Sequence, residues 1–133
     1  MAYDGSVRHS QYMRGHSTLL IVEDNPAVRS VVEAYMSRHG DWSEVISAPD
    51  AGRALMLAAE HEPGAIVLDN RMPGGDGIDV LPALRRTCPD AVIVIHTSDD
   101  SWAVREAAEE SGADAVVGKG QPLDQLVAIL HVS

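Results

Sequence analysis

The feature that most constrains the fold is an alternation of short, β-branched apolar runs with longer segments of helical periodicity. The apolar runs occupy residues 18–22, 44–48, 65–68, 91–96 and 115–118, and the second is the weakest. A run that is apolar throughout belongs to a strand covered on both faces, as in a parallel sheet. Strands that alternate with helices in this way predict one doubly wound α/β domain with right-handed crossovers.

The segments between the runs carry helix signals at both ends. Asn25 can cap and Pro26 can occupy the first turn of a helix that ends at Gly40. Pro82 lies inside the third helical pattern, where we expect a tolerated proline or a mild kink, with an early break as the alternative. The other helices are predicted at about 50–61, from about 78 through the apolar pattern of Ile78, Leu81 and Leu84, at about 102–111 and at about 123–131.

Length and charge limit the domain organisation and the partners. The 133 residues suit one domain of ordinary size. We interpret residues 1–17, which are polar and lack a sustained period, as a flexible leader or a remnant of expression, and residues 18–133 as the folded domain. A net charge of −10 disfavours direct binding to nucleic acid or to an anionic membrane. A DNA-binding role would then belong to another domain or polypeptide.

Cysteine content and hydropathy indicate the compartment. Cys88 is the only cysteine, so the chain cannot form an internal disulfide. No apolar run approaches the roughly 20 residues that span a bilayer, and the N-terminal sequence lacks the apolar centre of a secretory signal. We therefore expect a cytoplasmic protein.

Polar side chains stand at or just after the carboxyl ends of four predicted strands. They are Glu23, Asp24, Asp69, Thr97 and Lys119, the last being the only lysine beside nine arginines. Because the carboxyl ends of parallel strands share one sheet edge, we expect these side chains to meet there. Clustered carboxylates hold a hard cation, one carboxylate can attack phosphorus, and a hydroxyl and an ammonium can bind phosphoryl oxygens. The set predicts a phospho-accepting aspartate switch, although each residue alone could be a cap, a turn residue or a solvated charge.

Four stretches of the chain closely resemble the receiver domain of bacterial two-component response regulators, of the chemotaxis-regulator type. They are LLIVEDN, IVLDNRMPGGDG, IVIHTSDD and GADAVVGKG, in that order from about Leu19 to the C-terminus. The separations of 45 residues from Asp24 to Asp69 and 22 from Thr97 to Lys119 are close to those of the family. The resemblance implies a flavodoxin-like (βα)5 fold with a five-stranded parallel sheet of order 2-1-3-4-5.

The resemblance also implies a phosphorylation site with a bound cation. Asp69 would be the phosphoacceptor, receiving the group from a histidine kinase, a histidine phosphotransfer protein or a small phosphodonor. Asp24, Asp69 and the backbone carbonyl of Arg71 would bind Mg²⁺ directly, while Glu23 would act mostly through bound water. The phosphoryl state would then change affinity for a downstream effector domain or protein.

Two further pairs of residues receive roles from the resemblance. Lys119 would pair with the phosphoryl oxygens, and Thr97 would hydrogen-bond to them after phosphorylation. Thr97 is preferred as the switch residue because its spacing to Lys119 needs no gap, whereas a shifted alignment would place His96 there. Arg71 and Asp99 occupy positions that in this family tune acyl-phosphate hydrolysis, and we hypothesise that they slow attack by water.

The chain departs from the family pattern near its only lysine. Gly120 follows the lysine where the family commonly has proline, so the loop gains freedom. Val116 stands where the family usually has tyrosine or phenylalanine, so the aromatic flip that reports phosphorylation is missing in its usual form. Trp102 is interpreted as filler of its amphipathic helix, with a partner surface as the alternative.

The sequence is compatible with several functions. The favoured function is a phosphorylation-dependent binding switch. One alternative is a hydrolase with an aspartyl-phosphate intermediate, which the run from Asp69 to Arg71 disfavours because it offers no second acid. Others are a degenerate receiver that acts by constitutive contact and the N-terminal receiver of a DNA-binding transcription regulator. A homodimer could form through the face made by residues 102–111, 115–118 and 123–131.

Overall fold

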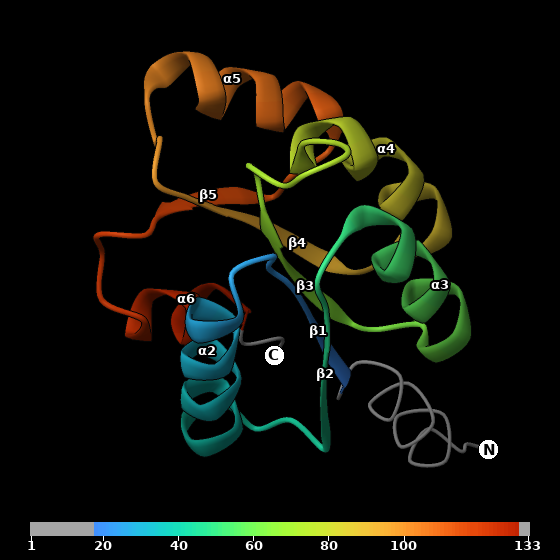
Figure 1. The fold of residues 1–133 in the computed structure, drawn as a ribbon, viewed down its shortest axis with the longest axis vertical. Helices are drawn as coiled ribbons and strands as arrows, with labels where there is room; N and C mark the ends of the chain where they lie inside the picture. The colour runs from blue at the N-terminus through green and yellow to red at the C-terminus, as the bar shows by residue number, and fades with distance from the viewer. Residues whose placement is uncertain (1–17, 131–133) are drawn as a thin grey trace, which may run out of the picture.

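A five-stranded parallel sheet forms the centre of the domain (Figure 1). The computed structural model describes residues 18–130, so the predicted leader and the last predicted helical residue, His131, lie outside the described residues. The strand order is β2-β1-β3-β4-β5, and each neighbouring pair is parallel, which confirms the predicted fold class. The strands are β1 Thr18–Val22, β2 Glu44–Ala48, β3 Ala65–Asp69, β4 Val92–Thr97 and β5 Ala115–Gly118.

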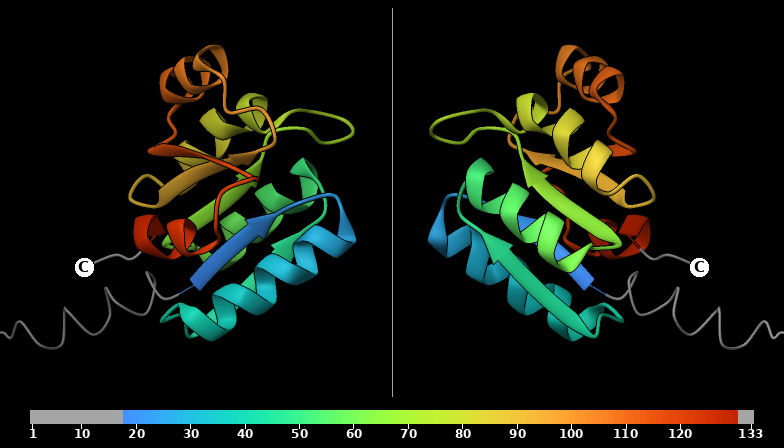
Figure 2. Two further views of the ribbon diagram at one scale, coloured as in Figure 1. Left: turned by 90° about the vertical axis from the view of Figure 1, so that its left-hand side faces the viewer. Right: turned by 90° about the vertical axis from the view of Figure 1, so that its right-hand side faces the viewer.

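Helices cover both faces of the sheet (Figures 1 and 2). One face packs against α2 and α6, and the other packs against α3, α4 and α5. In the described part of the chain, none of these helices has the length and hydropathy of a membrane span. The helices are α2 Pro26–His39, α3 Ala51–His61, α4 Gly77–Thr87, α5 Trp102–Ser111 and α6 Asp124–Leu130.

Two apolar cores result, one on each face of the sheet. Leu20 of β1 faces the core under α3 and α4, while its neighbours Leu19 and Ile21 face the core under α2 and α6. All five residues of β1 are buried because both faces of this central strand are covered. The edge strand β2 is more exposed over most of its length, in keeping with its weaker apolar pattern.

The helix ends follow the chemistry of their capping residues. The Asn25 side chain accepts hydrogen bonds from the backbone N–H groups of Ala27 and Val28 at 2.9 and 3.1 Å. Gly112 ends α5 with φ of +113°, a left-handed conformation that glycine adopts readily. Pro82 lies within α4 without ending it, so the early break does not occur.

A close approach at the start of α4 fixes the loop that follows β3. The Gly77 N–H donates to the carbonyl of Asn70 at 2.8 Å, and the Asn70 side chain accepts from the Ile78 N–H at 3.2 Å. A Cβ atom at Gly77 would overlap the carbonyl oxygen of Asp69 and lie 3.1 Å from Leu68 Cγ. Glycine at this position therefore lets α4 begin directly against the end of β3.

We expect the Gly77→Ala substitution to lower the free energy of unfolding by about 1–3 kcal/mol, because the added methyl group overpacks against backbone that cannot move freely. Urea unfolding measures this change. Gly120→Ala is the matched control, since its Cβ would meet nothing within 4 Å. Equal stability of the two variants would contradict the close approach at Gly77.

Candidate functional site

Three carboxylates meet at the carboxyl edge of the sheet. Glu23 and Asp24 follow β1, and Asp69 is the last residue of the neighbouring strand β3. One oxygen from each of these side chains lies within 4.8 Å of the others. Glu23 and Asp69 are almost fully buried. The structure therefore brings together the residues that the sequence predicted to converge.

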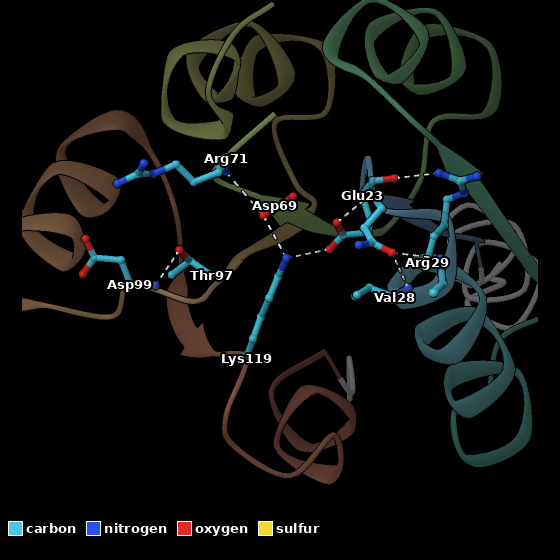
Figure 3. Close-up of polar contacts among 10 residues, drawn as sticks. Glu23, Val28, Arg29, Asp69, Arg71, Thr97, Asp99 and Lys119 are labelled. Atoms are coloured by element: carbon cyan, nitrogen blue, oxygen red, sulfur yellow. Dashed lines mark hydrogen bonds and ion pairs between the residues drawn. The ribbon is translucent and has the colours of Figure 1, made fainter. Parts of the chain in front are cut away.

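Local hydrogen bonds hold Glu23 in place. Its backbone N–H donates to the carbonyl of Ala48 at 3.0 Å, which extends the pairing of β1 with β2 by one residue. Its side chain accepts from the Asn25 N–H at 3.1 Å, and its backbone carbonyl accepts from Arg29 Nη1 at 2.8 Å (Figure 3). The acidic pair is thus tied to the start of α2.

Lys119 reaches from the loop after β5 into the carboxylate cluster (Figure 3). Its Nζ atom lies 2.8 Å from Glu23 Oε1 and 3.1 Å from Asp69 Oδ1. The Lys119 backbone N–H donates to the carbonyl of Thr97 at 2.7 Å, so the base of the side chain is anchored to β4. One ammonium group therefore bridges two of the three carboxylates.

The electrostatics of this cluster shift two pKa values. Burial, followed by repulsion from Glu23, raises the pKa of Asp69 to about 7, although the nearby Lys119 works in the opposite direction. Burial alone would lower the pKa of Lys119, but the hydrogen bond to Glu23 and the charge of Asp69 outweigh it and raise that pKa. The carboxylates thus need positive charge near them in order to ionise together.

Thr97, Asp99 and Arg71 lie on another side of Asp69 (Figure 3). The buried Thr97 hydroxyl accepts a hydrogen bond from the Asp99 N–H at 3.0 Å. The Arg71 N–H points to Asp69 Oδ1 at 3.4 Å, a long hydrogen bond. Hydrogen bonds from Ser101, with a smaller contribution from the charge of Arg71, lower the pKa of Asp99. The two predicted hydrolysis-tuning residues are therefore close enough to interact electrostatically.

Val116 does not join this cluster. It lies on β5, where its backbone carbonyl accepts a hydrogen bond from Arg105 Nη1 at 3.1 Å. Its side chain is 8% exposed and packs into the core beneath α3, α4 and α5. Val116, which stands where the family usually has an aromatic residue, is therefore part of the core covered by α5.

The sequence analysis assigned no site role to Asn70 or Arg29, and it considered His96 only as an alternative to Thr97 at the switch position. Asn70 is buried and joins the end of β3 to α4, and Arg29 holds the carbonyl of Glu23. His96 pairs in register with Asp69, and burial, followed by the charge of Lys119, lowers its pKa to about 4. The position of Asn70 directly after Asp69 could have indicated a role near the site. The contact of Arg29 with the carbonyl of Glu23 could not be predicted, because it depends on the direction in which α2 leaves the sheet.

The donor set fits a hard divalent cation such as Mg²⁺. All three side chains offer carboxylate oxygen, the ligand atom that Mg²⁺ prefers in proteins. After burial, the negative charge of Glu23 is the next cause of the raised pKa of Asp69. When bound, Mg²⁺ would neutralise this charge and reduce repulsion of an incoming phosphoryl group. The described residues thus include an acidic cluster whose ligand atoms suit this ion.

The fold and the site together define a class of protein. It is an α/β domain with a doubly wound parallel sheet, and three carboxylates and a lysine lie at the carboxyl edge of this sheet. Such an edge is suited to holding a cation and an anion together. Comparison with known proteins gives the family. The response regulator receiver domain family matches residues 19–131, and the chain belongs to this family of signalling domains. The resemblance drawn from the four sequence stretches is thereby confirmed.

Individual relatives agree with this assignment. The chain is 38% identical over 110 residues to the response regulator MprA of Mycobacterium sp. (strain KMS), which covers 83% of this chain and 47% of that protein. The chain thus spans about half the length of the curated relatives it matches. A two-component response regulator of the LuxR family from Aurantimonas sp. SI85-9A1 aligns with a TM-score of 0.79 and 32% identity, over 86% of this chain and 85% of that one.

A second solved structure that resembles the chain is that of a phosphorylated protein. It is a response regulator protein from Burkholderia pseudomallei with a phosphorylated aspartic acid, calcium ion and citrate. It aligns with a TM-score of 0.80 and 25% identity, over 87% of this chain and 67% of that one.

The raised pKa of Asp69 gives a prediction for the metal-free protein. Between the model-compound value of 3.8 and about 7, the folded state holds a proton on Asp69 that the unfolded state has lost. This contribution to stability is therefore present at low pH and is lost as pH rises through about 7. His96 acts in the opposite direction, because its folded pKa of about 4 lies below the ordinary 6.5.

We therefore expect the difference in unfolding free energy between Asp69→Asn and the parent protein to grow with pH. Relative to the parent protein, the unfolding free energy of the variant should rise by on the order of 1–3 kcal/mol between about pH 4 and pH 8. The reason is that the substitution removes a buried charge and leaves His96 unchanged. Urea unfolding in chelator at several pH values measures the difference. Asp90→Asn, at an exposed position, is the control substitution. A difference for Asp69→Asn that does not change with pH would contradict the raised pKa of Asp69.

Proposed function

We propose that this domain accepts a phosphoryl group on Asp69 and uses the resulting state to switch the binding of a downstream partner. The observation that carries the proposal is the placement of the Asp69 carboxylate, with Lys119 Nζ at 3.1 Å and two further carboxylates beside it. An ammonium for the phosphoryl oxygens and a group of carboxylates for a cation therefore lie next to one nucleophile.

The covalent step uses an Asp69 carboxylate oxygen as the nucleophile. That oxygen forms a bond to phosphorus while the bond from phosphorus to the donor nitrogen or oxygen breaks, and the donor leaves with its electron pair. The phosphodonor is a phosphohistidine of a histidine kinase or histidine phosphotransfer protein, or a small acyl phosphate. Lys119 then shifts from bridging Glu23 and Asp69 to pairing with the phosphoryl oxygens.

Mg²⁺ is the proposed cofactor. Asp24 and Asp69 would bind it directly with the backbone carbonyl of Arg71, and Glu23 would hold it mostly through water. The close carboxylate oxygens support this assignment. Asp69 would be both a ligand of the ion and the nucleophile. The domain would therefore assist its own phosphorylation and dephosphorylation only when the ion is present.

Thr97 is the proposed switch residue. Its hydroxyl oxygen accepts from the Asp99 N–H, and its backbone carbonyl accepts from the Lys119 N–H. The hydroxyl also carries one O–H donor, and a phosphoryl group on Asp69 would offer this donor a charged acceptor, which forms a stronger hydrogen bond than a neutral partner does. Turning of the hydroxyl towards the phosphoryl group would change the geometry of its contact with Asp99.

The partners follow from the family and the length of the chain. We propose a cytoplasmic domain that receives its phosphoryl group from a histidine kinase and acts on an effector domain or protein. Because the chain spans about half of the relatives it matches, it suits the receiver part of a regulator, including one with a DNA-binding domain. Its own charge of −10 argues that this domain does not contact nucleic acid directly.

A degenerate receiver is the second candidate function. Val116 and Gly120 favour it because they replace two residues that the family commonly uses in switching. The same face could carry a homodimer through α5, β5 and α6, although the acidic side chains of α5 would then need basic partners.

Intact mass spectrometry tests phosphorylation directly. With Mg²⁺ and acetyl phosphate, we expect one added phosphoryl group on the parent protein and none on Asp69→Asn or in the presence of chelator. Asp90→Asn should be phosphorylated like the parent, because this exposed residue is outside the site. A folded parent protein that gains no mass would overturn the proposal in favour of the degenerate receiver.

The lifetime of the phosphoryl group tests the roles of Arg71 and Asp99. If their side chains shield the acyl phosphate from water, the double variant Arg71→Ala and Asp99→Ala should lose it roughly tenfold faster, which corresponds to about 1.4 kcal/mol of barrier. Decay of the phosphorylated mass after removal of the donor gives the rate. The exposed pair Arg86→Ala and Asp90→Ala is the matched control, and equal lifetimes in both double variants would remove the idea.

A further inference from the structure

A pocket lies between α2, the end of β4 and the loop that leads from β5 to α6. Its volume is about 350 Å³, within the range of roughly 300–1,000 Å³ that is typical of small-molecule sites. Residues from all three segments line it, namely Val28 and Val31 of α2, His96 of β4, and Lys119, Gln121 and Leu123 of the loop. Figure 3 shows that Lys119 also reaches the carboxylate cluster, so the pocket and the cluster are neighbours.

The walls of this pocket are mainly apolar. Val28 and Leu123 are partly buried and pack against the core under α2 and α6. Val31 is 59% exposed, which is unusual for a large apolar side chain in the described part of the chain. An apolar group placed between these side chains would remove apolar surface from water, which is favourable. The pocket therefore suits a ligand whose larger part is apolar.

His96 brings one polar group to this lining. Side chains of a strand alternate between the two faces of a sheet, and Val92 and Val94 of β4 pack in the core under α2 and α6. His96 therefore faces the same two helices, and only 4% of its surface is exposed. Among residues 18–130, its Nε2 atom is the one buried side-chain nitrogen or oxygen without a hydrogen-bond partner.

A buried nitrogen without a partner is unfavourable, because it is shielded from solvent and forms no hydrogen bond within the protein. A ligand group that forms a hydrogen bond with the ring would remove this cost. The χ2 torsion of histidine is broad, so the ring of His96 can turn a nitrogen towards a ligand with little strain. The pocket therefore favours an apolar ligand with a polar group at one end.

The charges around the pocket favour an uncharged ligand. Apart from His96, Lys119 is the one ionisable residue of the lining, and its ammonium already lies within 3.1 Å of Glu23 and Asp69. An anion would compete with these two carboxylates for the ammonium, and a cation would be repelled by it. Burial lowers the pKa of His96 to about 4, so its ring carries no charge at neutral pH.

A hydroxyl group matches an uncharged histidine ring in either tautomer. Neutral imidazole has one N–H donor and one nitrogen that accepts. A hydroxyl group can accept from the first or donate to the second, whereas a carbonyl oxygen can only accept. Among common polar groups, a hydroxyl is therefore the one that pairs with His96 whichever nitrogen faces the pocket.

We propose that this pocket binds a small uncharged molecule with an apolar body, such as one aromatic ring, and a hydroxyl group. The hydroxyl group forms a hydrogen bond with His96, and the apolar body lies against Val28, Val31 and Leu123. An apolar cavity of roughly 150 Å³ is large enough for benzene, so one ring fits here with room for a substituent. This inference concerns a second site and does not depend on the phosphorylation of Asp69.

Binding of phenol and toluene tests the site. Toluene has the same ring as phenol with a methyl group in place of the hydroxyl group. Titrations followed by amide chemical shifts in NMR spectra locate the site and give the dissociation constants. We expect saturable shifts at the amides of Val28, Val31, Lys119 and Gln121, and roughly tenfold tighter binding of phenol than of toluene, as for one hydrogen bond to a buried group.

Two outcomes of these titrations would contradict the proposal. A folded parent protein that shows no saturable shifts around the pocket with phenol would overturn the site. Benzoate, a probe of similar size with a negative charge, should bind more weakly than phenol. Tighter binding of benzoate would overturn the uncharged class of ligand.

Substitution of His96 tests the polar contact. In His96→Leu an apolar side chain replaces the unpartnered nitrogen, so phenol and toluene should bind about equally. His96→Phe gives the same test if the leucine variant does not fold, and His96→Gln, which keeps a hydrogen-bonding group, should restore part of the preference for phenol. A tenfold preference that persists in a folded apolar variant would overturn His96 as the partner of the hydroxyl group.

A matched pair of exposed positions tests where the apolar body lies. Val31→Asp places a charge on the wall of the pocket and should weaken phenol binding roughly tenfold. Met56→Asp makes the same change in net charge at a residue of α3 that is 62% exposed and outside the pocket, and it should bind phenol like the parent. Equal affinities of the two variants for phenol would overturn the placement against α2.

Discussion

The ammonium of Lys119 is the contact on which the site depends. A parallel sheet delivers Glu23, Asp24 and Asp69 to one edge, where burial makes their mutual repulsion costly. Lys119 lies within 3.1 Å of two of them and is itself anchored to β4 through its backbone. A lysine supplies one compact charge that can leave one oxygen for another, which a planar guanidinium fork does less easily. The fold thus holds repelling groups together with a cation that can move.

Under the proposed function, phosphorylation would give this site a second pattern of contacts. In the unphosphorylated domain Lys119 pairs with carboxylates and the Thr97 hydroxyl pairs with Asp99. Under the proposed function, a phosphoryl group at Asp69 would accept hydrogen bonds from the Lys119 ammonium and from the Thr97 hydroxyl, because it is a charged acceptor. Hydrogen bonds in the loop after β4 connect Asp99, which donates to Thr97, to Ser101 at the start of α5. A change at Thr97 would therefore reach the surface through this loop.

The sequence predicted the fold and the convergence of the site because both follow from short-range patterns. Apolar runs, Asn25 as a cap and Gly112 as a helix end determine where the strands and helices lie, and the parallel sheet then collects Asp24, Asp69 and Lys119 at one edge. Other features depend on packing between distant segments. The contact between Lys119 and Glu23, the close approach of Gly77 to β3 and the pocket beside His96 have no periodic signal. They appear only when side chains from different elements are placed together.

Identification of the phosphorylated atom tests the central claim most directly. Reduction of the phosphorylated protein with borohydride converts an aspartyl phosphate to homoserine, and peptide mass spectrometry locates the converted residue. We predict conversion at Asp69 alone. Conversion at Asp24 or at another carboxylate, or a phosphoryl group recovered on His96, would contradict the assignment of Asp69 as the nucleophile.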